Sequence, residues 1–285
     1  MTGRLFIFGL GFTGLRFARA MQLNGWHVAG SVSSQQKADK MRDLRIAAEV
    51  FDGTGWTDAL EAALKGSTHI LSTIPPLQDG NPITDPVLRF WTPKAKDWMG
   101  YLSTTGVYGD HQGGWVDETT PVGGGTNAAR EAADTAWRAA GEAIIFRLPG
   151  IYGPGRSTLD RAESGRLSRI DKPGHVFSRI HVDDIVQTLI ASIGKPDPGA
   201  IYNVADDVPA PAHEVETYAC ELLGITPAPL RKIEEAGLSK RALEFYSQVR
   251  RVKNEKIKET LGISLLYPTY REGLRGCLAA RHVSA

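Results

Sequence analysis

The chain has 285 residues, which at roughly 150 residues per domain corresponds to one large domain or two modest ones. Hydrophobic residues make up 42% and charged residues 23%, which excludes a disordered chain. The chain has 33 Lys and Arg residues and 32 Asp and Glu residues, so its formal net charge is +1. This balance argues against nucleic-acid or membrane-surface binding as its main role. We therefore expect no nucleic-acid or membrane partner.

The cysteines and the first residues indicate a cytoplasmic protein. Cys220 and Cys277 are far apart, form no disulfide framework, and belong to no Cys-x-x-Cys zinc pattern. The apolar run Leu5 to Phe8 is too short for a signal peptide, and Gly9 ends it. No stretch approaches the roughly 20 apolar residues needed to span a bilayer.

The first half of the chain alternates short apolar runs with helical patterns. The runs predict strands at 5–8, 27–32, 46–51, 69–73 and 143–148, and one that ends at 101–103. The helical patterns cover 12–24, 35–42, 58–64 and the Ala-rich 127–140. This alternation predicts βαβ units, and hence an α/β fold with a Rossmann-type, doubly wound parallel sheet.

The second half is divided by Pro and Gly and predicts fewer strands. A helix is expected at 184–193, a strand at 201–204, and mostly short helices after Ala210. We predict a dinucleotide-binding domain at 1–149, to which 176–206 returns. Residues 150–175 and 207–285 would form a smaller, mostly helical substrate-binding region.

A Gly-x-Gly-x-x-Gly motif lies between the first predicted strand and the first predicted helix. Gly9 would permit the tight turn, Gly11 the approach of a pyrophosphate, and Gly14 close packing of helix on strand. The N–H groups at the helix start, around Phe12 and Thr13, would face the phosphates. The alternative is a plain strand–turn–helix with incidental glycines.

The stretch after the second strand favours NADP over NAD. A carboxylate is expected there when the ribose 2′-hydroxyl of NAD is bound, but none occurs before Asp39, inside the next helix. The groups available there are instead the hydroxyls of Ser33 and Ser34 and the cation of Lys37, which suit a 2′-phosphate. The alternative is that they only cap and solvate a helix. We also place Thr73, Leu148 and Pro149 among the cofactor-binding residues.

Several further segments together resemble the extended short-chain dehydrogenase/reductase family, the NAD-dependent epimerase/dehydratase group. They occur in the family's order between residues 4 and 275, at 103–109, 117–121, 147–155, 180–185, 202–204 and 270–274. The resemblance implies a Rossmann fold, a nicotinamide cofactor and a substrate region towards the C-terminus. It also implies that Thr104 occupies the position of the catalytic serine or threonine.

The chain departs from the family at its catalytic Tyr-x-x-x-Lys pair, where Thr126 and Arg130 stand instead. Threonine is too weak an acid to replace the phenol, and arginine stays charged, so Arg130 would act only as an electrostatic anchor. Tyr108 is the first candidate for the missing proton donor and bound water the second. Tyr152 could also replace the tyrosine, although both tyrosines match positions that usually shape the substrate pocket.

Two other groups of polar residues favour structural roles. His175 and His181 lie near Asp183 and Asp184, but their spacing fits no standard metal site, and Asp183 is well placed as a helix N-cap. No metal is therefore expected. The adjacent acids at 117–118 are expected on a solvated loop, with an acid/base pair as the alternative.

The sequence thus leaves two functions open. The first is an NAD(P)-binding, epimerase/dehydratase-like oxidoreductase acting on a small polar substrate, with a nucleotide-linked sugar as one class. The second is a sensor or scaffold that kept the NADP site and lost catalysis, which the absent Tyr-x-x-x-Lys favours. The oligomeric state stays open, with a homodimer as one option.

Overall fold

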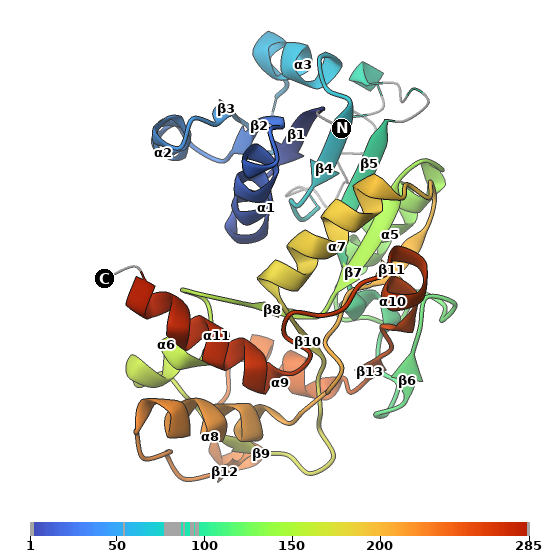
Figure 1. Cartoon of the computed structure of the whole chain (residues 1–285). Coiled ribbons are helices and arrows are strands. Elements are labelled where there is room, and N and C mark those ends of the chain that lie inside the picture. The colour runs from blue at the N-terminus through green and yellow to red at the C-terminus, as the bar shows by residue number, and fades with distance from the viewer. Residues whose placement is uncertain are drawn as a thin grey trace. The chain divides into compact units, whose positions relative to one another are not determined.

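A seven-stranded parallel sheet forms the first part of the protein (Figure 1). The computed structural model describes residues 3–53, 55–76, 87, 89–91, 94 and 97–283. The strands follow the order β11-β7-β5-β4-β1-β2-β3. Their bounds are β1 Arg4–Phe8, β2 His27–Val32, β3 Ala47–Val50, β4 His69–Ser72, β5 Trp98–Thr104, β7 Ile144–Leu148 and β11 Ile201–Asn203. The predicted Rossmann-type α/β fold is confirmed.

The predicted helices between these strands are present. They are α1 Phe12–Leu23, α2 Gln35–Asp43, α3 Asp58–Lys65, α5 Ala128–Ala139 and α7 Val182–Gly194. Local capping explains two of their starts, because Thr57 accepts a hydrogen bond from the N–H of Leu60, and Asn127 accepts one from the N–H of Arg130.

One capping prediction is wrong. Asp183 is not the N-cap of α7, because the helix begins at Val182 and Asp183 lies inside its first turn. The N–H of Asp183 donates instead to Nδ1 of His181, at 3.2 Å. A ring nitrogen, which sequence reasoning did not consider as a cap, thus satisfies this donor at the start of the helix.

The chain divides into two compact units. The first comprises residues 1–104, 127–147 and 189–202, and the second comprises 105–126, 148–188 and 203–285. Residues 105–126, which the sequence analysis placed with the dinucleotide-binding domain, group with the second unit. The pairing of β6 (Trp115–Val116) with β13 (Arg251–Val252) accounts for this grouping.

The second unit contains short helices, as expected, together with pairs of short strands. The helices are η1 Thr105–Tyr108, α6 Thr158–Glu163, α8 Ala212–Leu223, η2 Ile233–Glu235, α9 Lys240–Ser247, α10 Glu255–Leu261 and α11 Tyr270–Val283. Besides β6 and β13, the strands are β8 Gly150–Tyr152, β9 Ile170–Asp171, β10 Arg179–His181 and β12 Arg231–Lys232. β10 pairs with β8, and β12 with β9.

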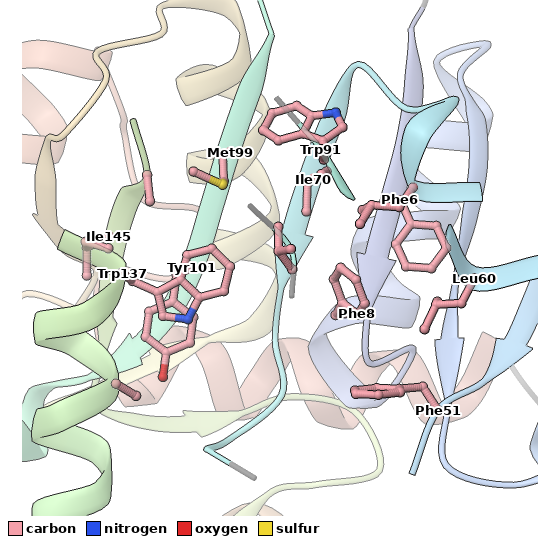
Figure 2. Packing of buried hydrophobic residues seen from close by; sticks show 14 residues of the cluster. Phe6, Phe8, Phe51, Leu60, Ile70, Trp91, Met99, Tyr101, Trp137 and Ile145 are labelled. Atoms are coloured by element: carbon pink, nitrogen blue, oxygen red, sulfur yellow. The ribbon is translucent and has the colours of Figure 1, made fainter. Parts of the chain in front are cut away.

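Aromatic side chains dominate the core of the first unit (Figure 2). Phe6 and Phe8 on β1 are fully buried, and their ring centroids lie 4.9 Å apart. Tyr101 of β5 stacks on Trp137 of α5, with centroids 5.2 Å apart. Trp137 is 1% exposed and belongs to this buried core.

His181, a buried histidine of the second unit, is packed among other side chains. His181 lies edge-on to Tyr152, and its Nε2 is 3.6 Å from Sγ of Cys277. Among the described residues, no group of three or more His, Cys, Asp or Glu is placed to hold a metal ion. Within the same residues, no helix combines the length and hydropathy required to cross a membrane.

Candidate functional site

The glycine motif forms a tight turn between β1 and α1. Gly9 has a φ of +92°, a conformation that favours glycine. The turn is held from two neighbouring strands. The Oγ of Ser31 accepts from the N–H of Gly9 at 3.1 Å, and Oγ1 of Thr73 donates to the carbonyl of Gly9 at 2.7 Å. Thr73 therefore fixes the turn itself.

The other two glycines have different surroundings. A Cβ at Gly14 would lie 2.2 Å from the carbonyl oxygen of Gly9, so only glycine permits this approach of α1 to the turn. A Cβ at Gly11 would meet no atom within 4 Å in the part of the chain that the structure describes. Open space at Gly11 is the arrangement that a pyrophosphate cradle requires.

A cavity of about 300 Å³ lies beside this turn. Its lining residues are Gly9, Leu10, Gly11, Ser31, Val32, Ser33, Lys37, Phe51, Thr73, Ile74 and Pro75. Gly11 is the N-cap of α1 and offers no side-chain oxygen to the helix. The first N–H groups of α1 thus keep no side-chain cap and suit an anion.

Five of the eleven predicted cofactor residues line this cavity: Gly9, Gly11, Ser33, Lys37 and Thr73. Lys37 donates to Oγ of Ser33 at 2.8 Å, and both side chains are exposed. Ser34 is the N-cap of α2, the capping position considered as its alternative role, although its side chain makes no capping hydrogen bond. Leu148 ends β7 and Pro149 follows it, and both group with the second unit.

Arg130 lies in the first turn of α5. Its charge affects the pKa of Tyr101, which the sequence analysis did not consider as a site residue. Burial raises the pKa of Tyr101, and the positive charge of Arg130 opposes this rise. Thr126 lies just before the N-cap of α5. Thr104, the predicted serine/threonine position, is the last residue of β5.

A buried ion pair lies between α5 and the strand β7. Arg147 donates through Nε and Nη2 to the two carboxylate oxygens of Asp134, at 3.1 and 2.7 Å. Ser103 of β5 donates to the same carboxylate at 2.6 Å. Sequence reasoning missed this network, although an arginine within the apolar strand 144–148 is a signal that a buried partner must exist.

Tyr108 belongs to a buried network in the second unit. Its hydroxyl donates to Oδ1 of Asn203 at 2.7 Å, and the tyrosine is 2% exposed. The backbone N–H of Asn203 donates to Glu118 at 2.7 Å. Burial raises the pKa of Glu118, so this carboxylate is not simply part of a solvated loop. Asp117 is half-buried and accepts a hydrogen bond from Thr119.

The second unit contains a larger cavity of about 420 Å³, which sequence reasoning also missed. Residues of β8, α6, β10, α8 and α11 line it. Its charged lining residues are Arg156, Asp160, Arg161, Arg166, Arg179 and Glu216. Four arginines against two carboxylates favour an anionic ligand. The available signal was Arg179 among the apolar residues Phe177, Ile180 and Val182.

Two comparisons with known proteins find relatives that cover most of the chain, whereas no family model matches it. A functionally unknown conserved protein from Silicibacter pomeroyi is 41% identical. The alignment covers 98% of this chain and 99% of that one, with a TM-score of 0.89. Protein YeeZ from Escherichia coli K12 is 29% identical over 259 residues, which cover 82% of this chain and 89% of YeeZ.

A relative of known activity shares the fold. The dTDP-glucose 4,6-dehydratase from Bacillus anthracis, solved in complex with NAD, has a TM-score of 0.77 at 19% identity and covers 98% of this chain and 96% of its own. The chain belongs to the family of the Silicibacter protein, with the fold of the extended short-chain dehydrogenases/reductases. The shared fold confirms the resemblance to short-chain dehydrogenases/reductases that the sequence segments indicated.

Proposed function

We propose that the chain is an NAD(P)-dependent oxidoreductase of the epimerase/dehydratase type that acts on a small polar substrate. The observation that carries the proposal is the cavity beside the glycine turn. It combines open space at Gly11 with the helix start of α1, which keeps no side-chain cap. These features suit a dinucleotide pyrophosphate, so the residues present fit the cofactor.

The chain's own residues would hold the cofactor in defined ways. The N–H groups of Phe12 and Thr13 at the start of α1 would hold the pyrophosphate, while Thr73 keeps the carbonyl of Gly9 in place. When bound, the nicotinamide supplies the acceptor or donor of a hydride. Leu148 and Pro149 complete the proposed set of cofactor contacts.

We assign NADP as the preferred cofactor on the charge of the cavity. Lys37 and Ser33 line it, with the ammonium group held 2.8 Å from the hydroxyl. A cation and a hydroxyl bind a 2′-phosphate, whereas the 2′-hydroxyl of NAD is typically held by a carboxylate. The Bacillus anthracis dehydratase was solved with NAD, so both cofactors belong in the test.

Thr104, Arg130 and Tyr108 are the proposed catalytic residues. Thr104 binds a substrate oxygen, and Arg130 anchors a ribose or substrate anion without transferring protons. Tyr108 is the first candidate for the proton donor, and it would have to exchange its hydrogen bond to Asn203 for one to the substrate. Bound water is the second candidate.

A sensor or scaffold that binds the cofactor is the second function. Thr126 and Arg130 in place of the Tyr-x-x-x-Lys pair favour it.

One experiment distinguishes the two functions. Wild-type protein with NADPH or NADP is mixed with sugar nucleotides and small polar carbonyl compounds, while the absorbance of the reduced nicotinamide is followed. Turnover that Gly11→Val abolishes supports the oxidoreductase. Cofactor binding without turnover of any compound class supports the sensor.

A further inference from the structure

Tyr108 and Asn203 form a buried pair in the second unit. The tyrosine hydroxyl donates to Oδ1 of Asn203 at 2.7 Å, and the two residues are 2% and 0% exposed. Tyr108 also packs with the apolar side chains of Val116, Ala205 and Val252. A hydrogen bond in such surroundings is shielded from competing water. The partner that the hydroxyl faces therefore strongly influences whether it keeps its proton.

The nitrogen of the Asn203 amide is not used by this hydrogen bond. Nδ2 is buried and makes no hydrogen bond to any described residue. A side-chain amide has two donors on its nitrogen and two acceptor positions on its oxygen, so both donors are unused in this arrangement. Burying them without a partner costs free energy. The amide thus holds donors for a partner that needs one.

The backbone at Asn203 is held, whereas its side-chain amide can turn. The N–H of Asn203 donates to Oε1 of Glu118 at 2.7 Å, and Asn203 is the last residue of β11. Half a turn about the last side-chain bond exchanges Oδ1 and Nδ2, which are nearly equal in size. The turn replaces one hydrogen bond to Tyr108 with another and, among the described residues, breaks no further one.

The two orientations of the amide favour different states of Tyr108. With Oδ1 on the hydroxyl, the amide accepts a hydrogen bond that only the neutral phenol can donate. With Nδ2 on the phenol oxygen, the amide donates instead, so the O–H can point at a substrate oxygen. The same N–H then supports the phenolate after the proton has left. The turned amide therefore suits a tyrosine that gives up a proton.

Charged groups surround the backbone of this pair. Nε2 of His111 lies 3.0 Å from the carbonyl oxygen of Tyr108, and Arg250 donates to the carbonyl of Gly109 at 2.7 Å. The hydroxyl itself faces the neutral amide of Asn203, so turning the amide changes a hydrogen bond without moving a charge. Further charged residues flank the packing residues in the chain, and these are Asp117, Glu118, Asp206, Asp207, Arg251 and Lys253.

We propose that Asn203 is a positioning residue for Tyr108, and that its amide turns to donate from Nδ2 to the phenol oxygen when the hydroxyl proton passes to the substrate. This assignment rests on the proposed function, in which Tyr108 is the first candidate for the proton donor. In that step the O–H bond of Tyr108 breaks, and the proton bonds to the substrate oxygen that hydride addition has made negative. The phenolate left behind takes a proton back from water. Asn203 itself transfers no proton.

The test follows the phenol and the amide by NMR, in the full chain with a fluorinated tyrosine at position 108. Fluorine lowers the pH at which a phenol ionises, and its signal reports this residue alone among the eight tyrosines. The Nδ2–H signals of Asn203 are identified by their loss in Asn203→Leu. We expect one of them to move to the position of a hydrogen-bonded proton as the phenol ionises. The Nδ2–H signals of Asn254, which donates to Ala205 and Asp207, are the internal control and should stay in place.

Asn203→Leu keeps the approximate shape of the side chain and removes the donor. The ionisation constant of the phenol is expected to fall about tenfold, because the phenolate loses a hydrogen bond. Asn254→Leu also replaces a buried amide of the second unit, but one with other partners, and is the matched control. It should change the constant less than about twofold. If Asn203→Leu does not fold, Asn203→Ser identifies the amide signals, and their titration in the wild-type background decides.

Two outcomes would overturn the inference. Nδ2–H signals of Asn203 that stay in place while the phenol ionises would show that the amide is fixed. An unchanged or higher ionisation constant in Asn203→Leu would show that the amide supports only the neutral phenol. The titration uses no substrate, so the two proposals fail separately. A fixed amide with turnover that Tyr108→Phe abolishes refutes only this inference, whereas a turning amide without turnover of any compound class supports the pair and refutes the oxidoreductase.

Discussion

Asp134 and Arg147 form a two-point ion pair inside the first unit, with the two side chains 0% and 1% exposed. The pair joins α5 to β7, and the hydrogen bond from Ser103 adds β5. The carboxylate of Asp134 therefore joins the ends of β5 and β7 to the helix α5, which carries Arg130. This network supports the region of the proposed chemistry without being part of it.

Breaking this pair is expected to destabilise the protein strongly. Arg147→Met leaves the Asp134 carboxylate buried without its cation, which typically costs about 3–5 kcal/mol. Urea denaturation of the variant measures the loss. The double variant Arg147→Met/Asp134→Leu removes both charges and should lose less than the single one. A single variant within about 1 kcal/mol of wild type would mean that the pair contributes little.

Cofactor preference is expected to reverse in Ser33→Asp. The new carboxylate would lie beside Lys37, where it repels a 2′-phosphate and can accept from the 2′-hydroxyl of NAD. Titration of NADPH and NADH against both proteins measures the change. The wild type should bind NADPH more tightly and the variant NADH. A wild-type preference for NADH would refute the assignment of NADP.

Asp206 is expected to make stability fall as the pH rises. Burial raises its pKa to about 8, although the charge of Arg179 opposes the rise. In the unfolded chain this carboxyl has a pKa of about 3.9, so between pH about 4 and about 8 the folded protein retains a proton that the unfolded chain has lost. This group's stabilisation is complete below pH about 4 and declines up to pH about 8.

Asp206→Asn removes this titration. Urea denaturation at several pH values should show a shallower fall in the variant, which at pH about 8 gains at least about 1 kcal/mol relative to wild type. Identical pH profiles for the two proteins would show that Asp206 ionises normally in the folded state.

Tyr108→Phe tests the proposed proton donor and its buried hydrogen bond together. Loss of the bond to Asn203 should lower the free energy of unfolding by about 1–2 kcal/mol. If an activity is found, turnover should fall about a hundredfold with little change in cofactor affinity. Stability and single-turnover rates are measured on the same preparation. Turnover within about tenfold of wild type would transfer the proton donation to bound water.

The sheet and the glycine turn could be predicted from the sequence because local pattern determines them. The run 5–8 is a buried strand, and the spacing of Gly9, Gly11 and Gly14 matches a backbone requirement within one strand–turn–helix unit. The predicted N-cap of α7 was nevertheless wrong. The ring of His181, and not the side chain of Asp183, accepts a hydrogen bond at the start of that helix.

The second cavity could not be predicted, because its residues come together only in the folded chain. Tyr152 and Glu216 are 64 positions apart on β8 and α8, and nothing near either residue in the sequence indicates the other. The same holds for Arg147 and Asp134. Each buried charge signals that a partner exists, but the tertiary packing decides which residue it is.

The central claim is that a dinucleotide binds beside the glycine turn, and equilibrium titration of wild type and Gly11→Val with NADPH, followed by protein fluorescence, tests it most directly. A Cβ at Gly11 meets no atom of the described residues within 4 Å, so the variant should fold normally, as circular dichroism can verify. The account predicts saturable binding to wild type and none to the variant, because valine would occupy the space of the pyrophosphate. Equal affinity of the two folded proteins for NADPH would contradict it.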